Sequence, residues 1–198
     1  MPRLEFWFEF ASTYSYLSAM RIEQLAATRG VEIMWRPFLL GPIFAAQGMT
    51  TSPFNLYPIK GAYMWRDMDR EAARMGLPPV VRPDPFPQNG MLAARVATLA
   101  TGNDWQAAFV RGVYDAQFAR GLDISGPDVV SDVLSALGQD PVPILDRARN
   151  DRTVKDALRA TTESARMLGI FGAPSFTAPD GEVFWGNDRL DAALDWVT

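Results

Sequence analysis

The chain has 198 residues, of which 48% are hydrophobic and 21% charged. This composition is typical of one folded globular domain, or of one domain with a large insertion, and excludes disordered and fibrous proteins. The formal charge of -4, from 19 basic and 23 acidic residues without a basic block, gives no reason to expect a nucleic-acid partner.

The absence of both cysteine and histidine limits the chemistry further. It excludes disulfide exchange, zinc sites with thiolate or imidazole ligands, and Ser-His-Asp or Cys-His catalysis. We expect no metal site, and any thiol chemistry must use a thiol supplied by a ligand. Because the chain shows neither a signal-peptide pattern nor 18 consecutive apolar residues, we expect a cytoplasmic protein without a membrane partner.

The N-terminal residues predict a βαβ unit. Residues 4–10, LEFWFEF, alternate in polarity and are rich in aromatic side chains, which favours a strand. A helix is predicted over residues 13–29, ending at Gly30, and residues 31–36 return to a period of two before Pro37. Two strands joined through a helix are expected to be parallel.

The middle of the chain is predicted to be helical from about residue 59 to 168, without a convincing strand. Residues 78–87 are rich in proline and predict a loop. Ser125, Gly126, Pro127 and Asp128 predict a capping box with proline at the first helical position. The expected helices cover residues 59–75, 90–100, 104–120, 128–137 and 152–168.

The C-terminal residues predict a hairpin and a last helix. Residues 175–177 and 182–185 flank a Pro-Asp-Gly turn, and residues 188–196 have a helical pattern. Each end of the chain is too small to bury a core alone, so the two ends must pair. We therefore predict an α/β fold in which residues 1–38 and 170–198 form one discontinuous domain and residues 39–169 an inserted helical domain.

Ser12 lies at the predicted start of the first helix. Unpaired backbone N–H groups and the positive end of the helix dipole favour an anion there, including a thiolate brought by a ligand. Serine is also simply a preferred N-cap residue, and that structural role is the alternative.

Ala173 and Pro174 directly precede a predicted strand. A cis peptide before Pro174 would turn the chain and leave the backbone of Ala173 free to pair with an extended, peptide-like ligand. A trans proline at the start of an edge strand is the alternative.

The segment from Trp185 to Asp188 joins the last strand to the last helix. Asn187 or Asp188 is expected to be the N-cap, with free N–H groups that could bind a carboxylate while Asp188 accepts from an ammonium group. An ordinary cap is again the alternative. Further polar candidates, which could equally be surface residues, are Asn55, Lys60 and Asn89.

Taken in order, these segments resemble the 2-hydroxychromene-2-carboxylate isomerases. That family belongs to the DsbA-like thioredoxin superfamily, beside the kappa-class glutathione transferases, and the resemblance spans essentially the whole chain. One departure is that the family often has Ser-Pro where this chain has Ser12-Thr13, which removes a rigid first helical turn. The motifs that carry the resemblance are FASTYSYL at 10–17, PFPQN at 85–89, GAP at 172–174 and WGNDRL at 185–190.

The resemblance implies a thioredoxin-like βαβ and ββα domain with an all-helical insertion, and glutathione as cofactor. It implies that Ser12 contacts the glutathione sulfur and that Ala173, before a cis Pro174, holds the peptide backbone. The γ-glutamyl end would be held by Trp185, Gly186, Asn187 and Asp188. Asn55, Lys60 and Asn89 would face the organic substrate, an aromatic or unsaturated keto acid, and the assembly would be a homodimer.

Three functions follow from this resemblance. The first is glutathione-dependent cis-trans isomerisation of 2-hydroxychromene-2-carboxylate, an intermediate of aromatic breakdown, or of a close analogue, by reversible thiolate addition. The second is a kappa-like glutathione transferase, which would release a conjugate instead. The third is a non-catalytic thioredoxin-like binding module, which the joint presence of Ser12, Pro174 and Asp188 disfavours.

Overall fold

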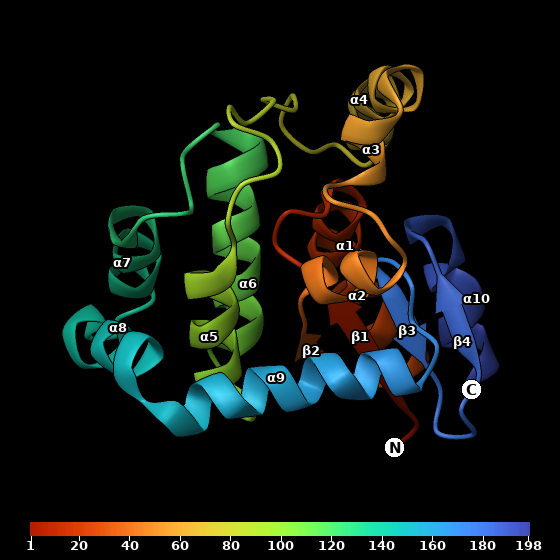
Figure 1. Cartoon of the computed structure of the whole chain (residues 1–198). Coiled ribbons are helices and arrows are strands. Elements are labelled where there is room, and N and C mark those ends of the chain that lie inside the picture. Colours follow the sequence, from red (N-terminus) through yellow and green to blue (C-terminus); the bar gives the residue numbers. More distant parts are fainter.

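The computed structural model describes residues 1–198 and contains one four-stranded sheet flanked by helices (Figure 1). The strands lie in the order β2-β1-β3-β4. Strand β1 is parallel to β2 and antiparallel to β3, which forms a hairpin with β4. The predicted βαβ unit, the hairpin and the pairing of the two chain ends are confirmed. The strands are β1 (Arg3–Phe8), β2 (Glu32–Pro37), β3 (Ser175–Thr177) and β4 (Val183–Trp185).

Helix α1 (Thr13–Arg29) connects the two parallel strands and packs against the last helix, α10 (Leu190–Trp196). Its N-cap is Ser12, and Gly30 ends it with a φ of 66°, a left-handed conformation that glycine adopts without steric cost. The sequence therefore predicted both ends of this helix correctly.

The helical segment between β2 and β3 contains no strand, as expected. Helix α9 runs from α8 past the sheet toward β3 and contacts β2, while α5 and α6 lie beside the sheet (Figure 1). None of the helices combines the length and the apolar composition that a bilayer-spanning segment needs. Five helices match the predicted ones within about two residues at most ends: α4 (Pro58–Arg74), α5 (Met91–Leu99), α6 (Gln106–Tyr114), α7 (Pro127–Ala136) and α9 (Arg152–Met167).

Other parts of this region differ from the prediction. The helix expected over residues 104–120 changes to a π-helix at Asp115–Ala119. Three helices were not predicted: α2 (Leu40–Ala46), α3 (Pro53–Leu56) and α8 (Pro141–Asn150). The first two are short, and α8 has Pro141 and Pro143 in its first turn, residues that are as typical of a loop as of a helix start.

Two predicted caps are wrong. The N-cap of α7 is Gly126 rather than Ser125, although Pro127 is at the first helical position as expected. Ser125 instead donates its N–H and its hydroxyl to the carboxylate of Asp123. A 3-10 turn at Asn187–Arg189 precedes α10, and no side chain caps either element.

The core is continuous between the sheet and the helical segment. Phe6 and Phe8 of β1 pack with Trp35 of β2, and Phe8 also contacts Tyr114 of α6. This contact fixes the inserted helices against the edge of the sheet where β1 ends. The domain boundaries after residues 38 and 169 stay a prediction.

Candidate active site

The hydroxyl of Ser12 lies between the start of α1 and the loop before β3. Its oxygen accepts from the N–H of Ser15 at 3.2 Å, as an N-cap does, and its O–H donates to the carbonyl of Ala173 at 2.9 Å. The two predicted site residues are 161 positions apart in the chain. The antiparallel pairing of β1 with β3 brings them together.

Several backbone donors around Ser12 have no acceptor in the protein. The N–H groups of Thr13 and Tyr14, in the first turn of α1, make no hydrogen bond, and neither does the N–H of Ala173. The N–H of Ser12 itself is bonded to the carbonyl of Glu9 at 3.0 Å. With the positive end of the helix dipole, the free groups favour an anion or a carbonyl oxygen beside the Ser12 hydroxyl.

The loop after β4 lies against the Ala173–Pro174 peptide, which is cis. The N–H of Gly186 donates to the carbonyl of Pro174 at 3.0 Å. The exposed ring of Trp185 packs on Phe171 with 4.8 Å between ring centroids. All three segments predicted to hold a peptide-like ligand therefore adjoin one another.

Asn187 and Asp188 differ sharply within this loop. The side chain of Asn187 is buried, and its Oδ1 accepts from Ser18 and from Arg21 of α1. Asp188 is exposed and pairs only with Arg189. The N–H groups of both residues have no protein acceptor. Asn187 can thus contribute its backbone to a ligand, whereas Asp188 can also contribute its carboxylate.

The three predicted substrate residues are not grouped together. Asn55 donates to the carbonyl of Phe86 at 3.1 Å, and Asn89 accepts from the N–H of Met91 at 3.0 Å, so both amides stabilise the loop before α5. Lys60 lies instead on an exposed surface of α4 beside Tyr57, Ile59 and Tyr63, and makes no ion pair.

Glu9 adjoins the candidate site, and the sequence analysis did not single it out. Its Oε2 accepts from the N–H of Ala11 at 2.9 Å, and its carbonyl accepts from Tyr114 and from Ser12. No lysine or arginine pairs with it, and burial raises the pKa of its carboxyl from 4.5 to about 7. In the sequence, the only signal was an acidic residue between two aromatic ones at the end of the first strand.

We expect Glu9 to make the stability of the fold fall as pH rises. The folded chain retains the proton of Glu9 between about pH 4.5 and pH 7, where the unfolded chain has released it. The free energy of unfolding should therefore decrease across this interval by roughly 3.5 kcal/mol, at about 1.4 kcal/mol per pKa unit, and stay lower above it.

Urea unfolding at pH 5 and pH 8 measures this effect. Glu9→Gln keeps an acceptor for Ala11 and should remove most of the difference between the two pH values. Glu182→Gln, at an exposed position of the hairpin, should leave it in place. An equal pH dependence in wild type and Glu9→Gln would show that Glu9 is ionised throughout.

The family model of the DSBA-like thioredoxin domain matches residues 3–197. The chain belongs to this family. Within the DSBA-like family, it is 30% identical over 189 residues to a 2-hydroxychromene-2-carboxylate isomerase of Sphingobium xenophagum, covering 95% of this chain and 94% of that protein. It is 27% identical to an isomerase of the same name from Pseudomonas putida, covering 94% and 90% of the two chains.

Two further similarities concern a solved structure and a more distant relative of this DSBA-like chain. A solved 2-hydroxychromene-2-carboxylate isomerase superposes with a TM-score of 0.84 at 26% identity, covering 98% of this chain and 93% of the other. The glutathione S-transferase kappa 1 of Caenorhabditis elegans is 23% identical over 209 residues, covering 98% and 90%. The predicted thioredoxin-like fold and family are confirmed, and the isomerases are among the chain's relatives over its whole length.

Proposed function

We propose that the chain is a glutathione-dependent isomerase that converts 2-hydroxychromene-2-carboxylate, or a close analogue, into trans-o-hydroxybenzylidenepyruvate. The observation that carries this proposal is the meeting of the Ser12 hydroxyl, the free N–H groups of α1 and the backbone of Ala173. The isomerase names of two relatives and the glutathione transferase name of a third support it.

The free groups of the site fit a γ-glutamyl tripeptide. The unpaired N–H of Ala173 can donate to a peptide carbonyl, and the unpaired N–H groups of Asn187 and Asp188 can donate to the γ-glutamyl carboxylate. The exposed carboxylate of Asp188 can accept from the ammonium group of the same residue. When bound there, glutathione would supply a thiol nucleophile for reversible addition to the conjugated carbon of the substrate, and it would be recovered unchanged.

Ser12 is placed to direct a proton at the sulfur. Its oxygen is held by the N–H of Ser15, so rotation about the C–O bond moves only the hydrogen. That hydrogen now points to the carbonyl of Ala173 and can turn toward a ligand atom beside it. The first turn of α1 adds the unpaired N–H groups of Thr13 and Tyr14. These groups stabilise negative charge on the sulfur without ionising any protein side chain.

The main alternative is a kappa-like transferase, which the name of the relative from C. elegans supports. Both functions use the same glutathione groups and differ in whether the sulfur leaves the organic ligand again. A non-catalytic binding module would need none of the free donors beside Ser12 and is the weaker alternative.

Calorimetric titration tests the shared requirement. Glutathione should release or absorb measurable heat, and at ten times its Kd it should stabilise the fold by roughly 1.4 kcal/mol. The dipeptide Cys-Gly, which keeps the thiol but lacks the γ-glutamyl residue, should bind at least about tenfold more weakly. Absence of heat and of any Tm shift with millimolar glutathione would contradict the proposal.

A further inference from the structure

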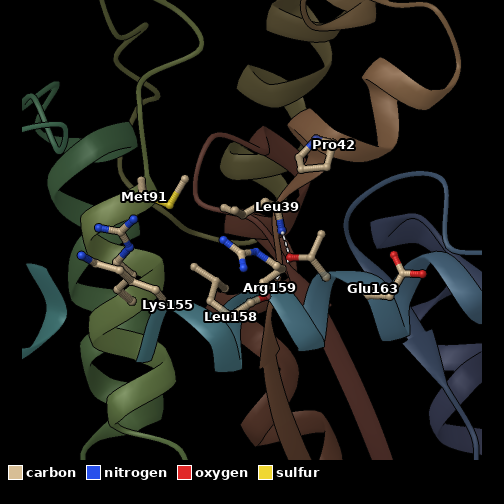
Figure 2. A pocket seen from close by; sticks show the side chains of 9 residues that line it. Leu39, Pro42, Met91, Lys155, Leu158, Arg159 and Glu163 are labelled. Atoms are coloured by element: carbon tan, nitrogen blue, oxygen red, sulfur yellow. Dashed lines mark hydrogen bonds between the residues drawn. The ribbon is translucent and has the colours of Figure 1, made fainter. Parts of the chain in front are cut away.

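A cavity of about 310 Å³ lies between the segment after β2 and helices α5 and α9 (Figure 2). In Figure 2, Leu39 and Met91 lie on one side of it and Lys155, Leu158 and Arg159 of α9 on the other. Its lining combines apolar side chains with charged ones: Leu39, Pro42, Met91, Arg95, Lys155, Leu158, Arg159, Thr162 and Glu163.

Some of the charged side chains that line this cavity have an ion-pair partner and others have none. Glu163 is bonded to Arg166, and Arg159 is paired with Asp156 at 3.2 Å. Arg95 and Lys155 are half-buried, and their side chains make neither a hydrogen bond nor an ion pair. Two cations without partners thus face one cavity from two helices.

Two residues that line the cavity are next in the chain to residues that contact the end of β1 and the segment leading to Ser12. Leu39 follows Phe38, whose N–H donates to the carbonyl of Phe8 at 3.1 Å. Met91 follows Gly90, which packs so closely on Phe10 that a Cβ there would come within 2.7 Å of the Phe10 Cβ. Phe8 and Phe10 are in the segment that leads from β1 into Ser12. Two of the residues that line the cavity thus directly follow residues that contact the end of β1 or the segment between β1 and Ser12.

We propose that Arg95 and Lys155 bind the carboxylate of the organic substrate, with its aromatic ring against Leu39, Met91 and Leu158. The guanidinium of Arg95 can bind a carboxylate through two parallel hydrogen bonds, and Lys155 adds a point charge. An apolar wall with a few charged groups is the usual composition of a small-molecule site. This inference rests on the proposed function, and it selects flat, anionic aromatic keto acids over neutral aromatic ketones.

The test compares two probes that differ in one group. Benzylidenepyruvate carries the carboxylate, and benzylideneacetone has a methyl group in its place. Calorimetry without glutathione should show tighter binding of benzylidenepyruvate to the wild type. Arg95→Gln and Lys155→Met should each weaken its binding about tenfold or more and leave benzylideneacetone unaffected. Arg95→Lys, which keeps the charge but loses the planar fork, should show a smaller loss.

Arg152→Gln is the matched control, because it removes a positive charge from the same helix at an exposed position outside the cavity. It should bind both probes like the wild type. Equal weakening by Arg152→Gln, equal loss of both probes in Arg95→Gln and Lys155→Met, or no binding of benzylidenepyruvate would each overturn the inference.

A parallel titration with glutathione separates this inference from the proposed function. The Arg95 and Lys155 variants should bind glutathione like the wild type. Charge-dependent binding of benzylidenepyruvate without glutathione binding would remove the proposed function and leave the carboxylate site standing. Glutathione binding without that charge dependence would do the reverse.

Discussion

Ser12→Ala should lower turnover by roughly tenfold to over a hundredfold while glutathione affinity changes little. In the proposed mechanism the hydroxyl would contact the reacting sulfur, and a hydrogen bond to a charged group contributes about 1.5 to 3 kcal/mol. Affinity depends mainly on the peptide-like remainder of the ligand, which the backbone of Ala173 and the Trp185–Asp188 loop would hold. Steady-state kinetics and calorimetry on the same variant measure the two effects separately.

Asp140→Ala is the control for the structural role of Ser12. Asp140 caps α8 by accepting from the N–H of Val142, as Ser12 caps α1. Its loss should cost about 1 kcal/mol of stability without changing turnover. If Ser12→Ala likewise lost only stability, Ser12 would be a helix cap and nothing more.

The second large effect concerns the thiol of bound glutathione. A free thiol has a pKa of about 8.5, and a position at a helix N-terminus beside a hydroxyl donor should lower it by one unit or more. Thiolate absorbance in the ultraviolet, followed against pH in the complex, measures this directly. Ser12→Ala should move the titration upward. A thiol that titrates as it does in free solution would favour a positioning role for Ser12, with the sulfur still protonated.

A Glu9 variant adds a second test to the titration of the glutathione thiol. Without histidine and cysteine, the chain has no side chain whose ordinary pKa lies near neutrality, yet burial raises the pKa of Glu9 to about 7. If glutathione binds beside Ser12 as proposed, the negative charge of Glu9 above that pH would oppose a second negative charge on the glutathione sulfur. Glu9→Gln should therefore lower the thiol pKa, in the direction opposite to Ser12→Ala. A pH profile of activity alone would combine the titrations of the thiol and of the Glu9 carboxyl.

The elements that were predicted correctly have signals local to the chain. Alternation in β1, the N-cap of α1 and the Pro-Asp-Gly turn each act within a few residues, and the structure has all three. A local interaction also explains one error. Ser125 was expected to cap α7, but its N–H donates to the carboxylate of Asp123 and the N-cap is Gly126. Helix α8 was missed because its first turn contains Pro141 and Pro143, which are also typical of a loop.

The candidate site was predicted where motifs mark it and missed where only packing creates it. The family motifs contain Ser12, Ala173 and Asp188. Burial of Glu9 depends on packing between β1 and α6, which no window of the sequence contains. Likewise, the cavity with Arg95 and Lys155 forms only when α9 folds back beside α5.

NMR of the products formed with substoichiometric glutathione tests the central proposal most directly. With 2-hydroxychromene-2-carboxylate in large excess, each glutathione should support many turnovers. The spectrum should show trans-o-hydroxybenzylidenepyruvate while the glutathione signals stay unchanged. Accumulation of a conjugate in one-to-one ratio with the glutathione consumed, or formation of the trans product at the same rate without glutathione, would contradict it.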